Sequence, residues 1–154
     1  MIYYILRGIK MLKIAVISAE CQNGREEESM ARRLTLALKN LAKNRELLVI
    51  TTLGRGLETL AAAITLSLKG TKLECVIPFE EQATDWSEDD RDIYFDILEH
   101  SFTNMLIETR KTKHNNTLCY NYILGKANLV FIGEEPSEEV MSIIKNSGKK
   151  IIKL

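Results

Sequence analysis

Short runs of aliphatic and β-branched residues alternate along the chain with longer segments of helical period. Six runs predict strands, at residues 12–17, 47–51, 73–77, 105–109, 128–132 and 150–153. Strands that alternate with amphipathic segments indicate βαβ units, in which the strands are parallel and helices cover the sheet. The pattern therefore predicts an α/β fold of three layers, with a mostly parallel sheet of five to six strands.

Two segments between these strands predict helices that differ in burial. Apolar residues at positions 30, 34, 38 and 41 recur every three or four residues, so residues 27–43 should form an amphipathic helix with its basic side chains in water. The segment 57–69 is apolar on nearly all sides and should form a buried helix. Gly70 follows this segment, and glycine is suited to end a helix in the left-handed conformation.

The second half of the chain contains further start and stop signals. Ser87 and the acidic residues after it are typical of a helix start, and this helix should run to about His100. Two later helices are predicted, one over residues 118–124 that Gly125 closes and one that begins at Pro136. Pro78 has no backbone N–H to give to a neighbouring strand, so we expect it to stop the third strand.

The length and composition indicate one domain. The chain has 154 residues, of which 45% are hydrophobic and 27% are charged. A chain of this size and composition is typical of a soluble domain, whose hydrophobic core needs neither disulfides nor a structural metal. We assign residues 11–154 to a single domain. Residues 1–10 are either an N-terminal extension, upstream of a second start at Met11, or an extra edge strand.

The charge is balanced overall but not along the chain. Lys plus Arg and Asp plus Glu both number 21, so the net charge is zero. A basic field over the whole surface is therefore absent, and we do not expect nucleic acid as a partner. Residues 1–77 hold 12 basic and 7 acidic side chains, and residues 78–154 hold 9 and 14. Such poles can meet across a homodimer interface, or they simply reflect an uneven distribution of charge over the helices.

The cysteines and apolar runs indicate where the protein works. The three cysteines, at positions 21, 75 and 119, have neither the spacing of a zinc site nor that of a disulfide framework. No apolar run approaches the ~20 residues that span a bilayer, and no basic segment precedes the short apolar run at the amino end. We therefore expect a cytoplasmic protein with no membrane contact, no metal and no required cofactor.

The turn after the second strand carries the most informative chemistry. Ligands of open parallel sheets bind at the carboxyl ends of the strands. Gly54 and Gly56 allow a tight turn whose helix N–H groups can hold a phosphate, and Arg55 could add a charge-assisted bond. The alternative is a glycine turn chosen for packing, with Arg55 in solvent. Glu58 is either a helix-start residue, whose negative charge is favourable at the positive end of the helix dipole, or a catalytic carboxylate.

Few other residues have a chemical signature. Trp86 is the only tryptophan and lies in a polar loop, where its indole could stack on a base or, as we favour, fix the loop to the domain. His100 and His114 have no partner at metal-ligand spacing. No Ser-His-Asp, P-loop or zinc-protease pattern occurs. The residues alone therefore leave open whether the protein is an enzyme.

Several of these residues occur in an order that resembles one family. The order comprises residues 53–58 with Ala61 and Ala62, then residues 76–82, Asp85, Trp86, Arg91, Tyr94, Ile97 and Leu98. It resembles the YpsA-like branch of the SLOG superfamily, which also includes the DNA-processing protein DprA and the lonely-guy phosphoribohydrolases. The resemblance covers roughly residues 11–131, and the Pro-Phe-x-x-Gln-x-x-x-Trp stretch at 78–86 is its most specific part.

The resemblance implies a Rossmann-like fold and a pocket for nucleotides or derivatives such as ADP-ribose or NAD, often in homo-oligomers. A fold of this kind has the strand order 3-2-1-4-5. By position, the implied ligand-binding residues are Ser18, Thr52, Gly54, Arg55, Gly56, Glu58, Gln82, Trp86 and Arg91. The loop at 133–136 reads Gly-Glu-Glu-Pro where phosphoribohydrolases have Gly-Gly-x-Gly-Thr. Its two carboxylates would repel an anion, which argues against that activity.

Three functions remain, in order of preference. The first is binding or sensing of a nucleotide-like ligand at the carboxyl edge of the sheet, with residues 54–58 at the phosphate. The second is hydrolysis of the N-glycosidic bond of a nucleotide, with Glu58 or Glu20 as the acid or base. The third is DNA binding by an oligomeric relative of DprA. The balanced charge disfavours it, although the basic helix at 25–45 leaves room.

Overall fold

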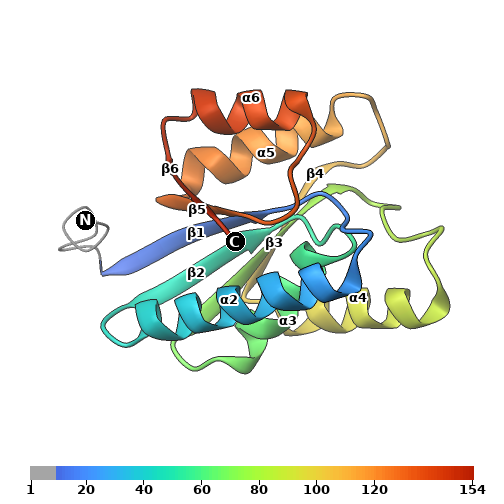
Figure 1. The fold of residues 1–154 in the computed structure, drawn as a ribbon. Coiled ribbons are helices and arrows are strands. Elements are labelled where there is room, and N and C mark those ends of the chain that lie inside the picture. Colours follow the sequence, from blue (N-terminus) through green and yellow to red (C-terminus); the bar gives the residue numbers. More distant parts are fainter. Residues whose placement is uncertain (1–9) are drawn as a thin grey trace.

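Six parallel strands form one sheet in the computed structural model, which describes residues 10–154 (Figure 1). The strands are β1 (Met11–Ile17), β2 (Glu46–Thr51), β3 (Thr71–Phe79), β4 (Thr103–Glu108), β5 (Leu129–Ile132) and β6 (Lys150–Lys153). The helices are α2 (Gly24–Ala42), α3 (Leu57–Ser67), α4 (Glu88–His100), α5 (Asn115–Lys126) and α6 (Glu138–Asn146). The strict alternation of strand and helix confirms the predicted α/β class.

The helices form two layers, one on each face of the sheet. Figure 1 shows α2, α3 and α4 on one face and α5 and α6 on the other. The first layer packs Leu34, Ala61 and Tyr94 against one side of the strands. The second layer packs Ile123 and Ile144 against the other side. This division follows from the chain path, because right-handed crossovers place helices on opposite faces when the direction of strand addition reverses. The fold is therefore the expected Rossmann-like three-layer sandwich.

The strand order is β4-β3-β2-β1-β5-β6. The order of the first three strands is as expected, but the fourth strand lies outside β3, and β5 and β6 take the places expected for the fourth and fifth strands. The direction of strand addition reverses after β4, when the chain returns to place β5 beside β1. The carboxyl ends of β1 and β5 thus form the topological switch point, where ligands of such sheets commonly bind.

Four details of the sequence interpretation are wrong. Helix α6 begins at Glu138 and not at Pro136, because Ser137 is its N-cap. Pro78 does not stop β3, which continues to Phe79 beside β4. The pairing of β3 with β2 has already ended at Cys75, so a missing N–H on that side leaves no bond unmade. Helix α5 runs from Asn115 to Lys126, and Gly125 lies within it instead of closing it. Asn23 caps α2, which therefore begins three residues before the predicted start.

Two further predictions concern the ends of the chain and the membrane. Residues 1–9 lie outside the described part of the chain, so the choice between an extension and an extra edge strand at 1–10 stays a prediction. Between residues 10 and 154, no helix has both the length and the apolar character needed to cross a membrane.

Candidate functional site

A buried carboxylate lies at the centre of the predicted site. Glu58 is in the first turn of α3 and is 2% exposed. Its carboxylate accepts hydrogen bonds from the Thr52 hydroxyl, from the backbone N–H of Ser18 at 3.1 Å and from the Tyr120 hydroxyl at 3.3 Å. Burial raises the pKa of Glu58 above its ordinary value, although the three hydrogen bonds act against this rise. Glu58 thereby joins the ends of β1 and β2 to α5.

Gly54 and Gly56 are each needed in the turn for a different structural reason. A Cβ on Gly54 would lie 2.9 Å from Glu58 Oε1, so the missing side chain gives room to this carboxylate. Gly56 has a φ of 89°, in the region that favours glycine, and it is the N-cap of α3 without a side-chain cap. The close approach that Gly54 permits is therefore with Glu58 of the same chain.

Arg55, between these glycines, is exposed and pairs with an aromatic ring. Its guanidinium carbon lies 5.3 Å from the centre of the Trp86 ring, a cation–π arrangement. The indole packs edge-to-face on Tyr94, with ring centres 5.3 Å apart, and contacts the core beneath. Trp86 therefore fixes its loop to the domain while one face of the ring meets Arg55.

The other two residues expected to wall the pocket hold the loop together. Gln82 Nε2 donates to the carbonyl of Thr52 at 3.1 Å, and its Oε1 accepts from the Tyr94 hydroxyl at 3.2 Å. Gln82 thus connects the end of β2 with α4. Arg91, in the first turn of α4, donates to the carbonyl of Thr84 at 3.3 Å, in the loop before that helix. The structure therefore brings Gln82 to the predicted turn, and it ties Arg91 to the loop before α4.

A second cation–aromatic pair lies at the same edge of the sheet. Lys111 Nζ is 5.7 Å from the centre of the Phe79 ring. Phe79 is the last residue of β3, and Lys111 follows β4, the neighbouring strand. Arg110 and Lys113, on either side of Lys111, are exposed. This pair was not found from the sequence, because the contact joins residues that are 32 apart in the chain.

The carboxyl ends of β1 and β5 are acidic. Ser18 Oγ accepts from the backbone N–H of Glu134 at 2.9 Å, which ties the two loops together. The Cys21 sulfur and one carboxylate oxygen each of Glu26 and Glu134 lie within 4.8 Å of one another. Glu20, the other carboxylate considered for acid or base chemistry, is exposed in the same loop. This concentration of carboxylates disfavours an anion at the switch point.

Two open depressions lie along the layer of α5 and α6. The larger, about 650 Å³, follows β5 and is lined by Glu135, Pro136, Ser137, Glu138, Met141, Ser142 and Lys145. The smaller, about 440 Å³, lies between α5 and α6. None of the residues expected to bind a ligand lines either depression.

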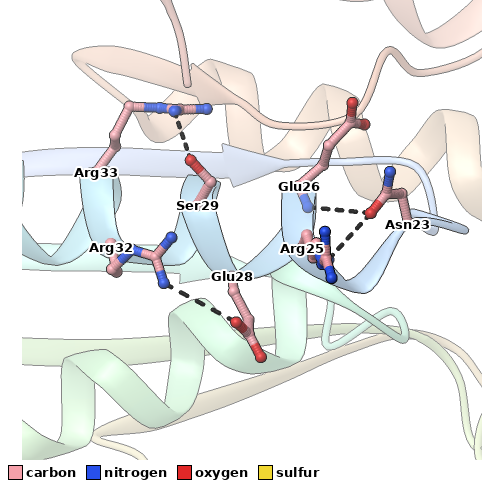
Figure 2. A network of polar contacts seen from close by, with 7 residues as sticks. All are labelled: Asn23, Arg25, Glu26, Glu28, Ser29, Arg32 and Arg33. Carbon is pink, nitrogen blue, oxygen red and sulfur yellow. Dashed lines mark hydrogen bonds and ion pairs between the residues drawn. The ribbon is translucent and has the colours of Figure 1, made fainter.

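Figure 2 shows the polar contacts at the start of α2, the basic helix. Asn23 Oδ1 accepts from the N–H groups two and three residues further along, at 3.0 and 3.4 Å. Arg33 donates to Ser29 Oγ at 2.8 Å, and Arg32 lies 3.9 Å from the carboxylate of Glu28. The arginines are therefore held by neighbours one turn earlier, and glutamates on the same helix offset part of their charge.

The comparisons with known proteins support the fold. No protein-family profile matches the chain, and no curated protein is significantly similar in sequence. Among solved structures, the chain is similar to DNA processing protein A from Helicobacter pylori, with a TM-score of 0.67 and 13% identity. The match covers 92% of this chain and 64% of that chain, so this chain spans less than two thirds of that protein. The fold is thus like that of DprA, a member of the SLOG superfamily.

This comparison corrects one expectation. The structure of DNA processing protein A is described for a unique single-stranded DNA binding mode. A protein with this fold therefore binds nucleic acid, which overturns the argument that nucleic acid would not be a partner. The balanced total charge is compatible with separate basic and acidic regions along one edge of the sheet, and the sum over the chain hides them.

Proposed function

We propose that the chain binds single-stranded DNA along the carboxyl edge of β2, β3 and β4. The observation that carries the proposal is the presence of two cation–aromatic pairs on this edge, Arg55 with Trp86 and Lys111 with Phe79. Proteins that bind single strands combine cations that follow the phosphates with aromatic rings that stack on bases. The similar fold of a protein that binds single-stranded DNA supports the proposal.

The position of the basic residues favours this part of the edge. Arg55 follows β2 and Lys111 follows β4, so the two cations flank the end of β3. Arg110 and Lys113 are also exposed there and add two positive charges. In contrast, the ends of β1 and β5 carry carboxylates that would repel phosphates. The strand would therefore pass over the ends of β2, β3 and β4.

The acidic residues in the loop after β3 set a limit on the electrostatic contribution. Glu80, Glu81 and Asp85 are exposed between Phe79 and Trp86. They weaken the attraction for phosphates, so stacking on the aromatic rings supplies a large share of the affinity. Bases are free to stack only when the strand is unpaired, and we expect a preference for single-stranded over duplex DNA.

The finer assignments belong to the same proposal. A free nucleotide has the phosphate and base chemistry of a DNA strand, so the nucleotide-type ligand expected from the sequence would compete for this edge. The YpsA-like branch remains our proposal for the place of the chain within the SLOG superfamily, and it rests on the order of the quoted residues alone. Hydrolysis is less well supported, because Glu58 is buried under three hydrogen bonds.

The test is a titration of the full chain with a labelled oligo-dT, followed by fluorescence anisotropy over a range of salt concentrations. Four basic residues at this edge would give a slope of log K against log salt of no more than about 3, at about 0.7 per phosphate contact. Arg55→Ala and Lys111→Ala should each weaken binding and lower the slope by about 0.7. Lys69→Ala is the matched control, because Lys69 is exposed in the turn before β3, at the opposite edge of the sheet.

The outcomes separate the alternatives. Weaker binding in both variants, with Lys69→Ala unchanged, would support the proposed path. Unchanged affinity in both variants would refute it. Competition by AMP or ADP-ribose at concentrations far below those at which inorganic phosphate competes would favour the free nucleotide as the ligand. Salt-independent binding would refute phosphate contacts at Arg55 and Lys111.

A further inference from the structure

The outer edge of β4 differs from the other edge of the sheet. Within residues 10–154, β4 pairs only with β3, and β6 pairs only with β5. Strand β6 has the sequence Lys-Ile-Ile-Lys, with exposed lysines at both of its ends. Lysines on an edge strand prevent pairing with a further strand. Strand β4, Thr-Asn-Met-Leu-Ile-Glu, has neither a lysine nor a proline.

Apolar side chains are exposed along this unprotected edge. Met105 is 40% exposed and Leu106 is 47% exposed, although both lie in the middle of a strand. Successive residues of a strand point to opposite faces, so each face of the sheet has one exposed apolar residue at β4. Phe102, just before the strand, is 61% exposed. An edge of this kind offers both backbone groups and apolar area to a partner.

We propose that β4 is the interface of a homodimer, in which β4 of one copy pairs antiparallel with β4 of a second copy. A two-fold axis perpendicular to the sheet would join the six strands of each copy into one continuous sheet. Rotation about this axis leaves each face of the sheet on its own side, so residues that lie opposite each other across the interface have side chains on the same face. At the axis, one residue therefore lies opposite its own counterpart, and the axis does not fall between two residues of the strand. The two middle residues of β4 are Met105 and Leu106, and the axis lies at one of them.

The charges at the two ends of β4 make the second copy the best-matched occupant. Asp96 and Glu99, both exposed, lie in the last turns of α4 before the amino end of the strand. Arg110, Lys111 and Lys113, all exposed, follow its carboxyl end. Antiparallel pairing brings the basic end of each copy next to the acidic end of the other. The attraction occurs twice, once on each side of the axis.

The first experiment measures the mass of the full chain by light scattering over a concentration series, in the absence of DNA. We expect twice the 17.5 kDa of one chain at high concentration. Met105→Lys with Leu106→Lys should give a monomer, because two lysines of each copy would meet at the axis. Leu36→Lys is the matched control: Leu36 is 68% exposed on α2, and this variant should remain a dimer. Circular dichroism checks that each variant is folded.

A cross-link locates the axis. In a background with Cys21→Ser, a cysteine on the axis faces its own copy at about 5.5 Å or less between Cα atoms, which permits a disulfide. Met105→Cys or Leu106→Cys should therefore form a covalent dimer on mild oxidation. Thr103→Cys should not, because at about 3.3 Å per residue it would lie more than about 13 Å from its counterpart.

Three results would overturn the interface. These are a monomer at the highest concentration at which the chain stays in solution, a dimer that persists with both lysines in β4, and efficient cross-linking of Thr103→Cys but of neither central residue. Because no DNA is present, these results are independent of the proposed DNA binding.

Discussion

The carboxylate of Glu58 accepts a hydrogen bond from the backbone N–H of Ser18, 40 residues earlier in the chain, at 3.1 Å. This contact ties the first turn of α3 to the end of β1. The Tyr120 hydroxyl reaches the same carboxylate from α5, on the other face of the sheet. Glu58 therefore joins three connections at the carboxyl edge, and its protonation state is coupled to the stability of the whole domain.

We expect Glu58→Gln to change the pH dependence of stability. A glutamine keeps the shape and can still accept from Ser18, but it has no proton to release. The pKa of Glu58 in the folded chain is raised above its usual value of 4.5. At pH values between 4.5 and the folded pKa, Glu58 therefore holds a proton in the folded chain that it has already released in the unfolded chain. The free energy of unfolding of the wild type should therefore fall, relative to the variant, as the pH rises from about 4.5 through the folded pKa.

Urea denaturation of both proteins across this pH range measures the difference. Glu58→Ala serves as a second variant, because it leaves three donors without their acceptor and should cost about 1–3 kcal/mol per buried unsatisfied group at all pH values. A difference between wild type and Glu58→Gln that does not vary with pH would contradict a raised pKa.

Two glycine substitutions should have opposite signs. Gly54→Ala places a methyl group 2.9 Å from Glu58 Oε1 and should reduce the free energy of unfolding by about 1–3 kcal/mol. Gly125→Ala meets nothing within 4 Å and lies inside α5, so it should stabilise the chain by about 0.5–1 kcal/mol. Thermal or urea unfolding of both variants compares them directly. Equal effects would show that room at Gly54 is not needed for Glu58.

A partly buried ion pair on the second face predicts a non-additive result. Lys126 Nζ lies 2.6 Å from Glu74 Oε1, and the side chain of Glu74 is only 5% exposed. Lys126→Ala leaves this carboxylate without its cation and should cost about 2–4 kcal/mol. Adding Glu74→Gln to that variant removes the uncompensated charge, so the double variant should be more stable than Lys126→Ala alone. Additive losses in the double-mutant cycle would contradict this.

The strand and helix pattern allowed the fold class to be predicted because periodicity is a local property. Each buried strand is a short apolar run, and each helix has an apolar stripe that repeats every three or four residues. The Gly-Arg-Gly turn could also be located, since a turn residue and its helix are neighbours in sequence. In contrast, the extent of β3 past Pro78 depends on where β2 stops pairing, which no local pattern contains.

The partners of the candidate site could not be predicted, because they come from distant segments. Tyr120 contacts Glu58 across 62 residues, and Lys111 contacts Phe79 across 32. The prediction about nucleic acid was wrong for a related reason. It used the total charge, whereas the attraction for a nucleic acid depends on where charges lie on the surface. The DNA path that we propose depends on Arg55 and Lys111, which the sheet brings to one part of an edge.

The last prediction concerns Trp86 as a reporter of base stacking. Because it is the only tryptophan of the chain, its fluorescence reports on one position. A base that stacks on the indole or on the Arg55 guanidinium should quench this fluorescence, and Trp86→Leu should raise the Kd by roughly 5–150-fold, the equivalent of about 1–3 kcal/mol. Phe102→Leu is the control, since Phe102 is exposed at the amino end of β4. An oligonucleotide with abasic residues keeps the phosphates and removes the bases. Equal quenching and equal affinity for the abasic and the dT strands would show that Trp86 does not stack on a base, and that any binding at this edge uses the phosphates alone.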